Sequence, residues 1–302
     1  MKARLILNPN ASKADDADAL RLAVHAEPDV ELCDCEAPGH GRELAAEAAE
    51  QGYDLVIAAG GDGTVNEVVN GLARDFSASV LGVIPLGTGN DLARTLALPD
   101  DPVLAFHIAL HGERRALDLI RVEGPDEILY AANVCAGGFT GDLDDAMTDD
   151  LKATWGPLSY LIGTAKALPD MSEYETLIAW DGAELEHVDA FNVVVANGRT
   201  AGGGRPAAPR ANPEDGLLDV VIVKECTGVE LAGLAARALT GDYLDSEHVI
   251  FRRARRVRVD STPGMWFNLD GEMHSNEPVT FECMPGALRM AVGPAYTPEP
   301  ED

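Results

Sequence analysis

The fold is decided by residues 54–67, DLVIAAGGDGTVNE, where an apolar run passes through glycines into a helical pattern. The apolar run, residues 54–59, is typical of a parallel strand that is buried on both faces. From Val65 to Leu72, apolar residues recur at i, i+3, i+4 and i+7, which is one face of a helix. Glycines at such a turn let backbone N–H groups approach phosphate oxygens, and the helix N-terminus adds partial positive charge. The stretch predicts a parallel α/β unit with an anion-binding turn.

Strand and helix patterns also alternate on both sides of this stretch. Short apolar runs occupy residues 4–7, 30–33 and 80–84, and helical patterns occupy residues 41–51 and 91–98. This alternation indicates a parallel sheet with crossover helices. The loops after three of these strands, beginning at Asn8, Gly60 and Pro85, should gather at one sheet edge, where open α/β sheets bind ligands. The second glycine turn has a plainer interpretation, because Thr88 and Asp91 have the spacing of a capping box.

The pattern changes near residue 118. Strand-like runs then follow with fewer helices between them, at residues 117–122, 128–134, 176–180, 191–196, 218–223, 256–259 and 279–283. Two helical patterns interrupt them, at residues 157–168 and 229–240. We expect an antiparallel β-sandwich. The predicted domains are residues 1–118 with a returning segment, 286–302, and residues 119–285.

The composition is strongly acidic. Among 302 residues there are 23 Lys and Arg against 51 Asp and Glu, a formal net charge of −28. Such a charge argues against a protein that binds nucleic acid by neutralising phosphates. Only five of the basic residues are Lys, a composition that suggests a very salty cytoplasm, where the Debye length falls to about 3 Å near 1 M salt. An ordinary acidic enzyme is the alternative.

Cysteine content and hydropathy indicate a compartment. The five cysteines are odd in number and include no C-x-x-C pair, so neither a disulfide framework nor a zinc site is indicated. The N-terminus has too short an apolar run for a signal peptide, and no run approaches 18 apolar residues. We expect a cytoplasmic protein that contacts a membrane without spanning it.

Four motifs together carry a family resemblance. Residues 60–67 (GGDGTVNE) and 85–94 (PLGTGNDLAR) resemble the catalytic domain of the diacylglycerol kinase and sphingosine kinase family, above all its bacterial and archaeal lipid kinases. Residues 212–219 (NPEDGLLD) and 268–272 (NLDGE) extend the resemblance over nearly the whole chain. Because NAD kinases and phosphofructokinases share a bare GGDGT, the second turn and the late motif are the parts that distinguish the lipid kinases from them. The resemblance implies a Rossmann-like N-terminal α/β domain, a C-terminal antiparallel β-sandwich and an active site in the cleft between them.

The resemblance also implies which residues bind ATP. These are Asn8, Pro9, Asn10, Ala11, Ser12, Gly61, Asp62, Gly63, Thr64, Val65, Asn66, Glu67 and Thr88. Asp62 is expected to hold a metal or to orient the phosphates, and we count it among the catalytic residues. Two features depart from the family pattern: the first loop, which usually reads Asn-Pro-x-Ser-Gly, has no such glycine at Ala11-Ser12-Lys13, and Cys35 replaces a threonine. Both departures concern how the adenosine is held.

The late motif supplies a candidate base. Asp270 and Glu272 flank Gly271, so in an extended segment their side chains would project to one face. Phosphoryl transfer needs a carboxylate to receive the proton of the attacking hydroxyl. In the family one of this pair is the base; we favour Glu272, with Asp270 assisting or binding metal. The alternative is a plain Asp-Gly hairpin turn.

Two further segments suggest a metal and a membrane. The turn from residue 212 offers amide, carboxylate and backbone oxygens, which Mg²⁺ prefers. The resemblance places a structural Mg²⁺ on Asp215 with oxygens of Asn212 and Leu217; a turn without metal is the alternative. Five arginines fall within residues 252–258, either as a basic patch that faces a membrane or as paired surface residues.

The sequence therefore predicts an ATP- and Mg²⁺-dependent kinase that phosphorylates the free hydroxyl of a diacylglycerol-like lipid, with a dialkylglycerol as a further possible acceptor. It would contact the inner face of the membrane peripherally and transiently, and an edge strand of the β domain could pair two copies into a homodimer. One alternative is a NAD kinase-like or other soluble-metabolite kinase that shares the GGDGT loop. Another is a nucleotide-binding regulator without catalysis.

Overall fold

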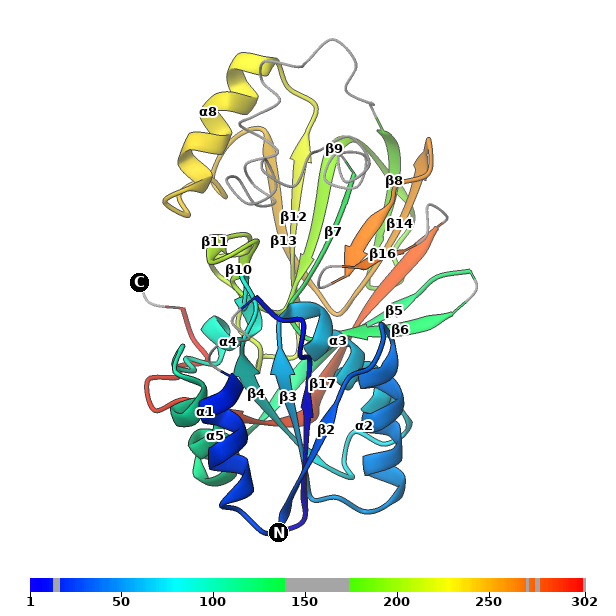
Figure 1. The fold of residues 1–302 in the computed structure, drawn as a ribbon. Coiled ribbons are helices and arrows are strands. Elements are labelled where there is room, and N and C mark those ends of the chain that lie inside the picture. Colours follow the sequence, from blue (N-terminus) through cyan, green and yellow to red (C-terminus); the bar gives the residue numbers. More distant parts are fainter. Residues whose placement is uncertain (13–16, 126, 139–173, 270–271, 275–277, 301–302) are drawn as a thin grey trace. The chain divides into compact units, whose positions relative to one another are not determined.

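The computed structural model describes residues 1–12, 17–125, 127–138, 174–269, 272–274 and 278–300 (Figure 1). The helix predicted at residues 157–168 lies outside these ranges. The chain divides into two compact units. Unit 1 comprises Met1–Leu119 and Pro285–Pro298, and unit 2 comprises Ile120–Met284 and Glu299–Asp302.

Unit 1 is an α/β sandwich. Its four parallel strands lie in the order β2 (Val30–Asp34), β1 (Ala3–Leu7), β3 (Leu55–Gly60) and β4 (Val80–Pro85). The end of β17 (Val279–Val292) joins β4 in parallel, with Met290 opposite Leu81. Helices α1 (Ala17–His25) and α5 (Pro102–His111) cover one face, and α2 (His40–Glu50) and α3 (Asp62–Gly71) cover the other (Figure 1). The short helices η2 (Leu72–Arg74) and α4 (Asp91–Thr95) follow α3 and β4.

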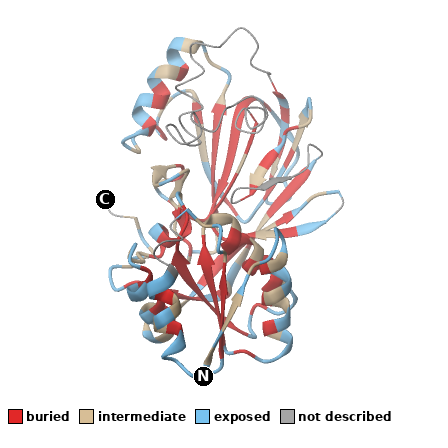
Figure 2. Cartoon of the chain, viewed as in Figure 1, coloured by how far each residue is buried: buried red, intermediate tan, exposed pale blue. Residues whose placement is uncertain are grey.

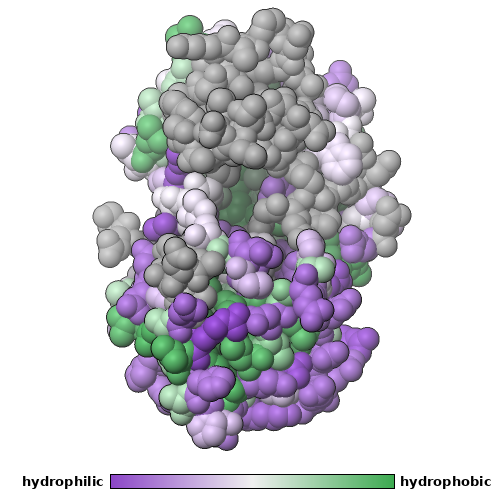
Figure 3. All heavy atoms as spheres, in the orientation of Figure 1, coloured by the Kyte–Doolittle hydropathy of each residue, from purple (hydrophilic) through white to green (hydrophobic). Residues whose placement is uncertain are grey.

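The central strands of unit 1 are apolar because both of their faces are covered. Every residue of β1, β3 and β4 is buried, whereas the helices expose their outer sides (Figure 2). Leu5, Ile57 and Ile84 contribute to one continuous core with Phe106 of α5. Hydrophilic side chains gather along the outer surface near α2 (Figure 3), in keeping with the acidic composition.

Unit 2 is antiparallel. Its strands are the end of β5 (Glu113–Glu123), β6 (Ile128–Ala131), β7 (Val134–Gly138), β8 (Tyr174–Trp180), β9 (Glu186–Ala196), β12 (Leu218–Lys224), β13 (Val249–Ala254), β14 (Arg256–Thr262), β15 (Phe267–Leu269), β16 (Glu272–His274) and the start of β17. A separate pair comprises β10 (Thr200–Ala201) and β11 (Arg205–Pro206), and one helix, α8, spans Gly228–Ala238. Strand β9 branches, because its first half pairs with β8 and its second half with both β7 and β12.

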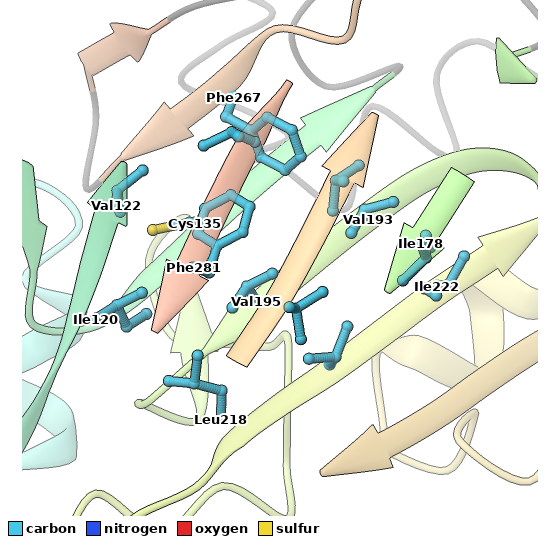
Figure 4. Close-up of a cluster of buried hydrophobic side chains, with 14 of the residues drawn as sticks. Ile120, Val122, Cys135, Ile178, Val193, Val195, Leu218, Ile222, Phe267 and Phe281 are labelled. Carbon is cyan, nitrogen blue, oxygen red and sulfur yellow. The ribbon is translucent and has the colours of Figure 1, made fainter. Parts of the chain in front are cut away.

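Alternation along β12 builds two apolar layers in unit 2. Val220 and Ile222 point into the main core with Phe267 and Phe281 (Figure 4). Val221, on the opposite face, packs in a second cluster beneath α8. This period of two is the expected signature of a strand that is buried on both faces.

The predicted fold class is confirmed, with local corrections. The strand predicted at residues 128–134 is two strands, interrupted at Asn133, whose carbonyl oxygen accepts the N–H groups of Asn197 and Gly198. The helix predicted to reach residue 98 ends at Thr95. Helix α5 and strand β13 were not predicted. Among the helices that the structure describes, none is long and apolar enough to cross a membrane.

Candidate active site

Three loops at the carboxyl edge of the unit 1 sheet are hydrogen-bonded to one another. Asn8, directly after β1, donates from Nδ2 to Thr64 Oγ1 of α3 at 3.1 Å. Ser12 donates to the carbonyl oxygen of Leu86, after β4, at 3.3 Å, and Thr88 donates to Ser12 Oγ at 3.2 Å. The predicted gathering of the three loops is confirmed, because neighbouring parallel strands end at the same edge.

The two glycine turns touch through their backbones. An added Cβ at Gly87 would lie 2.4 Å from the Cα of Gly61, and one at Gly61 would lie 3.3 Å from the Cα of Gly87. Asn90 fixes the second turn, since its Oδ1 accepts the Gly87 N–H at 2.9 Å and its Nδ2 donates to the Gly87 carbonyl at 2.7 Å. Only glycine permits this approach, so Gly87 is required for the packing of the two turns.

The N-terminus of α3 suits an anion. Its N-cap residue is Gly61, which has no side chain to cap this end of the helix. At Gly63, in the first turn, an added Cβ would meet no atom within 4 Å, so the space beside the backbone is open. Uncapped N–H groups and the helix dipole attract phosphate, and a side chain at Gly63 would occupy the space that it needs.

The carboxylate of Asp62 links the two turns. Its Oδ1 accepts the backbone N–H of Asp91, at the start of α4, at 2.9 Å. Burial, followed by the negative charge of Asp91, raises the pKa of Asp62, and hydrogen bonds from backbone N–H groups at the start of α4 act in the opposite direction. The predicted capping box is wrong, because the N-cap of α4 is Asn90 and Thr88 bonds to Ser12 instead. Asp91, which is 4% exposed, is a neighbour that the sequence reasoning treated only as a cap.

Glu67 acts on a third helix. Its Oε1 accepts the N–H of Gly39 at 2.8 Å and its Oε2 accepts the N–H of Gly41 at 2.9 Å, which caps the N-terminus of α2. A Cβ at Gly41 would lie 2.6 Å from Oε2, so glycine is needed there. Burial, followed by the charge of Glu67, raises the pKa of Cys35 to about 11, so this thiol is protonated at neutral pH. The role of Glu67 in capping was not anticipated from the sequence.

The other residues predicted to contact the nucleotide fall into two groups. In the first loop, Asn8 Oδ1 accepts the N–H of Asn10 at 3.0 Å, and the Asn8 carbonyl accepts the N–H of Ala11, so the loop that contains Pro9 is a compact turn. On α3, the side chains of Val65 and Asn66 are buried. The side chains of Val65 and Asn66 therefore contribute to the packing of α3. If the loops bind a ligand, they would do so mainly through their backbone.

The late motif has a different geometry from the one predicted. Strands β15 and β16 pair antiparallel, with Leu269 opposite Glu272. The chain direction therefore reverses between these two residues, which favours the hairpin alternative over an extended segment. Glu272 begins β16. Asp270 and Gly271 lie outside the described residues.

The turn before β12 offers oxygen ligands. Asn212 Oδ1 accepts the N–H of Glu214 at 2.9 Å, and Asp215 Oδ1 accepts the N–H of Leu217 at 3.0 Å. Asp215 Oδ2 lies 3.6 Å from Nη1 of Arg253. Among the residues described, no three His, Cys, Asp or Glu side chains are grouped to hold a metal. A cation here would therefore need backbone or water oxygens as well as carboxylates.

Asp219, two residues after Leu217, was missed by the sequence reasoning. Its side chain is 1% exposed, and neither carboxylate oxygen accepts a hydrogen bond from the described residues. Burial raises the pKa of Asp219 to about 6, although Arg253 acts in the opposite direction. Orphaned carboxylate oxygens beside a turn of carbonyl and carboxylate groups suit a hard cation such as Mg²⁺. The signal that could have found Asp219 is its place at the end of the NPEDGLLD motif, to which no role was given there.

The arginines of residues 252–258 are partly paired. Arg252 lies 4.7 Å from the ring centroid of Trp180 and 3.8 Å from Glu186. Arg258 lies 3.6 Å from Asp260. These contacts favour the paired-residue interpretation over a continuous basic patch.

Comparisons with known proteins agree with this architecture. Residues 2–122 match the diacylglycerol kinase catalytic domain, and residues 134–292 match the YegS C-terminal NAD kinase beta sandwich-like domain. A diacylglycerol kinase of Bacillus subtilis (strain 168) is 35% identical over 277 residues, which cover 90% of this chain and 89% of the relative. The chain belongs to the diacylglycerol kinase family.

Other members of the diacylglycerol kinase family and one more distant protein extend the likeness. A diacylglycerol kinase of Staphylococcus saprophyticus is 31% identical over 284 residues, 93% of this chain and 92% of that protein. A crystal structure of a diacylglycerol kinase from Bacillus anthracis str. Sterne superposes with a TM-score of 0.79 at 25% identity and covers 98% of each chain. A NAD kinase from Archaeoglobus fulgidus, solved with ATP, has a TM-score of 0.53 at 12% identity over 98% of this chain and 95% of that one, a likeness of fold alone.

Proposed function

We propose that this protein is a lipid kinase that transfers the γ-phosphoryl group of ATP to the free hydroxyl of a diacylglycerol-like lipid. The observation that carries the proposal is the interlocked loop cluster of unit 1, which includes the N-terminus of α3, with Gly61 as its N-cap and open space beside Gly63. The family membership supports the choice of a lipid alcohol as acceptor, since the relatives named above are diacylglycerol kinases.

The loop cluster would bind the nucleotide mainly through its backbone. The first N–H groups of α3, at Gly61, Asp62, Gly63 and Thr64, would face the phosphates. The loop at residues 8–12 and Thr88 form the rim, because they are tied together through Ser12. Glu67 and Cys35 lie on the side of α2, where the departure from the family's threonine would affect the adenosine.

The chemistry requires a proton acceptor and an oriented phosphate. The lipid hydroxyl oxygen forms a bond to the γ-phosphorus, the bond from that phosphorus to the bridging oxygen of ADP breaks, and the hydroxyl proton passes to a carboxylate. We assign that proton to Glu272, with Asp270 assisting. Asp62 would orient the phosphates, since its position is fixed against the start of α4.

Two roles are proposed for Mg²⁺. Bound with ATP, it neutralises charge that develops on the transferred phosphoryl group. A second, structural ion would be held by Asp215 with oxygens of Asn212 and Leu217, at the turn before β12. The orphaned oxygens of Asp219 support a cation in this neighbourhood.

The acceptor class can be tested directly. Purified protein is incubated with radiolabelled ATP and Mg²⁺ in mixed micelles that contain diacylglycerol, dialkylglycerol or neither, and in parallel with NAD. We expect labelled phospholipid with one or both glycerolipids and none with NAD. Exclusive labelling of NAD would replace the proposal with a soluble-metabolite kinase, and no transfer at low or multimolar KCl would indicate a nucleotide-binding regulator.

A further inference from the structure

The buried carboxylate of Asp219 has no hydrogen-bond donor from the described residues. Asp219 lies in β12, directly opposite Ala196 of β9 on one side and Arg253 of β13 on the other. By alternation its side chain shares a face with Val221, which is the face that packs beneath α8. A buried carboxylate without hydrogen bonds is strongly destabilising unless another charge compensates it.

The compensation that the structure offers is incomplete. Arg253 Nε lies 3.5 Å from Asp219 Oδ1, and Nη1 of the same guanidinium lies 3.6 Å from Asp215 Oδ2. The third nitrogen, Nη2, donates to the carbonyl oxygen of Arg210 at 2.9 Å. One guanidinium is therefore divided between two carboxylates and a carbonyl, and neither carboxylate contact has the length of a charge-assisted hydrogen bond.

A second arginine that influences Asp219, Arg210, has a partner of its own. Arg210 forms an ion pair with Asp245 at 3.2 Å. Counted in their ionised forms, the three carboxylates of Asp215, Asp219 and Asp245 meet the two guanidinium groups of Arg210 and Arg253, which leaves one negative charge. This excess lies beside the oxygen-rich turn at residues 212–217.

We propose that Asp219 is a further acidic group of the cation site, and that Arg253 shares the carboxylates of Asp215 and Asp219 with the bound ion. The inference rests on the cation site proposed above for the turn before β12. Asp219 holds the ion through its carboxylate, directly or through one water, and Asp215 approaches it from the turn. Because Arg253 adds positive charge to the same carboxylates, it weakens cation binding while it stabilises the ion-free protein.

The test is a titration without nucleotide. The melting temperature of the full chain is measured against MgCl₂ and, separately, CaCl₂, with KCl adjusted to keep ionic strength constant. A ligand that binds only the folded state raises the melting temperature with its concentration. We expect the wild-type chain to respond and Asp219→Asn to bind the ion about 10- to 100-fold more weakly, the range typical of lost groups that support a metal.

Two further variants make the result specific. Asp260→Asn is the matched control, because Asp260 also pairs with an arginine, Arg258, but is outside the group formed by Asp215, Asp219 and Asp245, and it should respond as the wild-type chain does. Arg253→Gln should lower the ion-free melting temperature and tighten cation binding by about tenfold, since one competing positive charge is removed. If Asp219→Asn fails to fold, Arg253→Gln still tests the shared-carboxylate arrangement.

Three outcomes overturn the inference: no cation response in the wild-type chain, a wild-type response in Asp219→Asn, or unchanged cation affinity in Arg253→Gln. The lipid assay on the same preparations separates this inference from the proposed function. An enzyme that phosphorylates lipid without the Asp219-dependent cation response refutes only the inference. A chain that shows the response but phosphorylates no lipid refutes only the proposed function.

Discussion

Each of the two units has a carboxylate whose pKa is raised by burial, and the surrounding hydrogen-bond donors differ. In unit 1, Asp62 is surrounded by the start of α4, where it accepts the N–H of Asp91. In unit 2, Asp219 accepts no hydrogen bond from the described residues and has only a share of Arg253. Burial raises the pKa of both groups, but Asp62 is half-buried and has backbone donors, whereas Asp219 is almost wholly buried and has none from the described residues.

The difference indicates what each region does. Backbone donors in unit 1 fix Asp62 before any ligand arrives, so the loops are preorganised around the position proposed for the phosphates. In unit 2, acceptors remain unused, a state that is costly unless a cation completes it. Unit 1 therefore has donors to offer to an anion, and the turn of unit 2 has acceptors to offer to a cation.

The largest expected effect is a loss of lipid phosphorylation when Asp62, the carboxylate of unit 1, loses its charge. Asp62→Asn retains an oxygen that can accept the Asp91 N–H, so the fold should persist, but the loss of charge should lower lipid phosphorylation by about 10²- to 10⁴-fold. Asp101→Asn is the matched control, because Asp101 caps α5 through Val103 and Leu104, and Asn caps helices equally well. Equal activity in both variants would reduce Asp62 to a helix cap.

Disrupting the contact between the two glycine turns should have the next largest effect. Gly87→Ala places a Cβ 2.4 Å from the Cα of Gly61, so the free energy of unfolding should fall by about 1–3 kcal/mol and activity should fall with it. Gly233→Ala, in α8 with no atom within 4 Å of the added Cβ, should instead stabilise by about 0.5–1 kcal/mol. Denaturant titration of both variants measures this contrast, and a wild-type stability for Gly87→Ala would contradict the backbone contact.

Added salt should affect the stability and the activity of the molecule as a whole, not those of one site. With a net charge of −28, repulsion should loosen the chain in dilute buffer, and added KCl should screen it as the Debye length falls from about 10 Å at 0.1 M to 3 Å at 1 M. We expect melting temperature and activity to rise together with KCl up to molar concentrations. An unchanged melting temperature across the series would contradict this adaptation.

The smallest expected effect concerns Glu31, whose pKa is lowered, whereas those of Asp62 and Asp219 are raised. A hydrogen bond from Tyr53, followed by contacts with Arg4, lowers the pKa of Glu31 below its usual 4.5. A lowered pKa stabilises the fold above the unfolded-state value, and this contribution is lost as the pH falls through the folded-state value. Because the Glu31 side chain is 47% exposed, Glu31→Gln should cost less than about 1 kcal/mol at pH 7 and nothing in acid.

The matched control for this pair is Glu27→Gln, at an exposed residue of the loop before β2. Melting temperatures of the two variants from pH 3 to 8 should diverge only above the range in which Glu31 titrates. A constant difference between Glu31→Gln and the wild-type chain at every pH would assign the effect to packing instead of charge.

The sequence predicted the elements whose pattern follows from burial. β3 and β4 are wholly apolar because helices cover both faces, and the glycines after them mark the turns. Helix α5 was missed because its apolar residues surround it almost completely and show no amphipathic period. Strand β13 was missed because Arg252 and Arg253 obscured its alternation, although Arg253 pairs directly with Asp219.

The sequence located candidate residues of the site but did not predict the contacts that these residues make. The glycine motifs located Asp62 and Glu67, but their hydrogen bonds to the starts of α4 and α2 depend on helix positions that no local pattern encodes. The reversal between β15 and β16 was open to prediction, since Asp-Gly is a preferred pair in two-residue hairpins. Asp219 ends the NPEDGLLD motif, but its lack of hydrogen-bond donors among the described residues and its place opposite Arg253 are known only from the structure.

The central claim is that the backbone at the start of α3 binds the phosphates of ATP. Gly63→Ala tests it most directly, because the added Cβ meets no protein atom within 4 Å and leaves the fold unstrained. Calorimetric titration with a non-hydrolysable ATP analogue should show binding to the wild-type chain and an affinity at least about tenfold weaker in Gly63→Ala, a loss of about 1.4 kcal/mol, with no fall in melting temperature. Equal affinity in the two proteins would place the phosphates elsewhere and contradict the account.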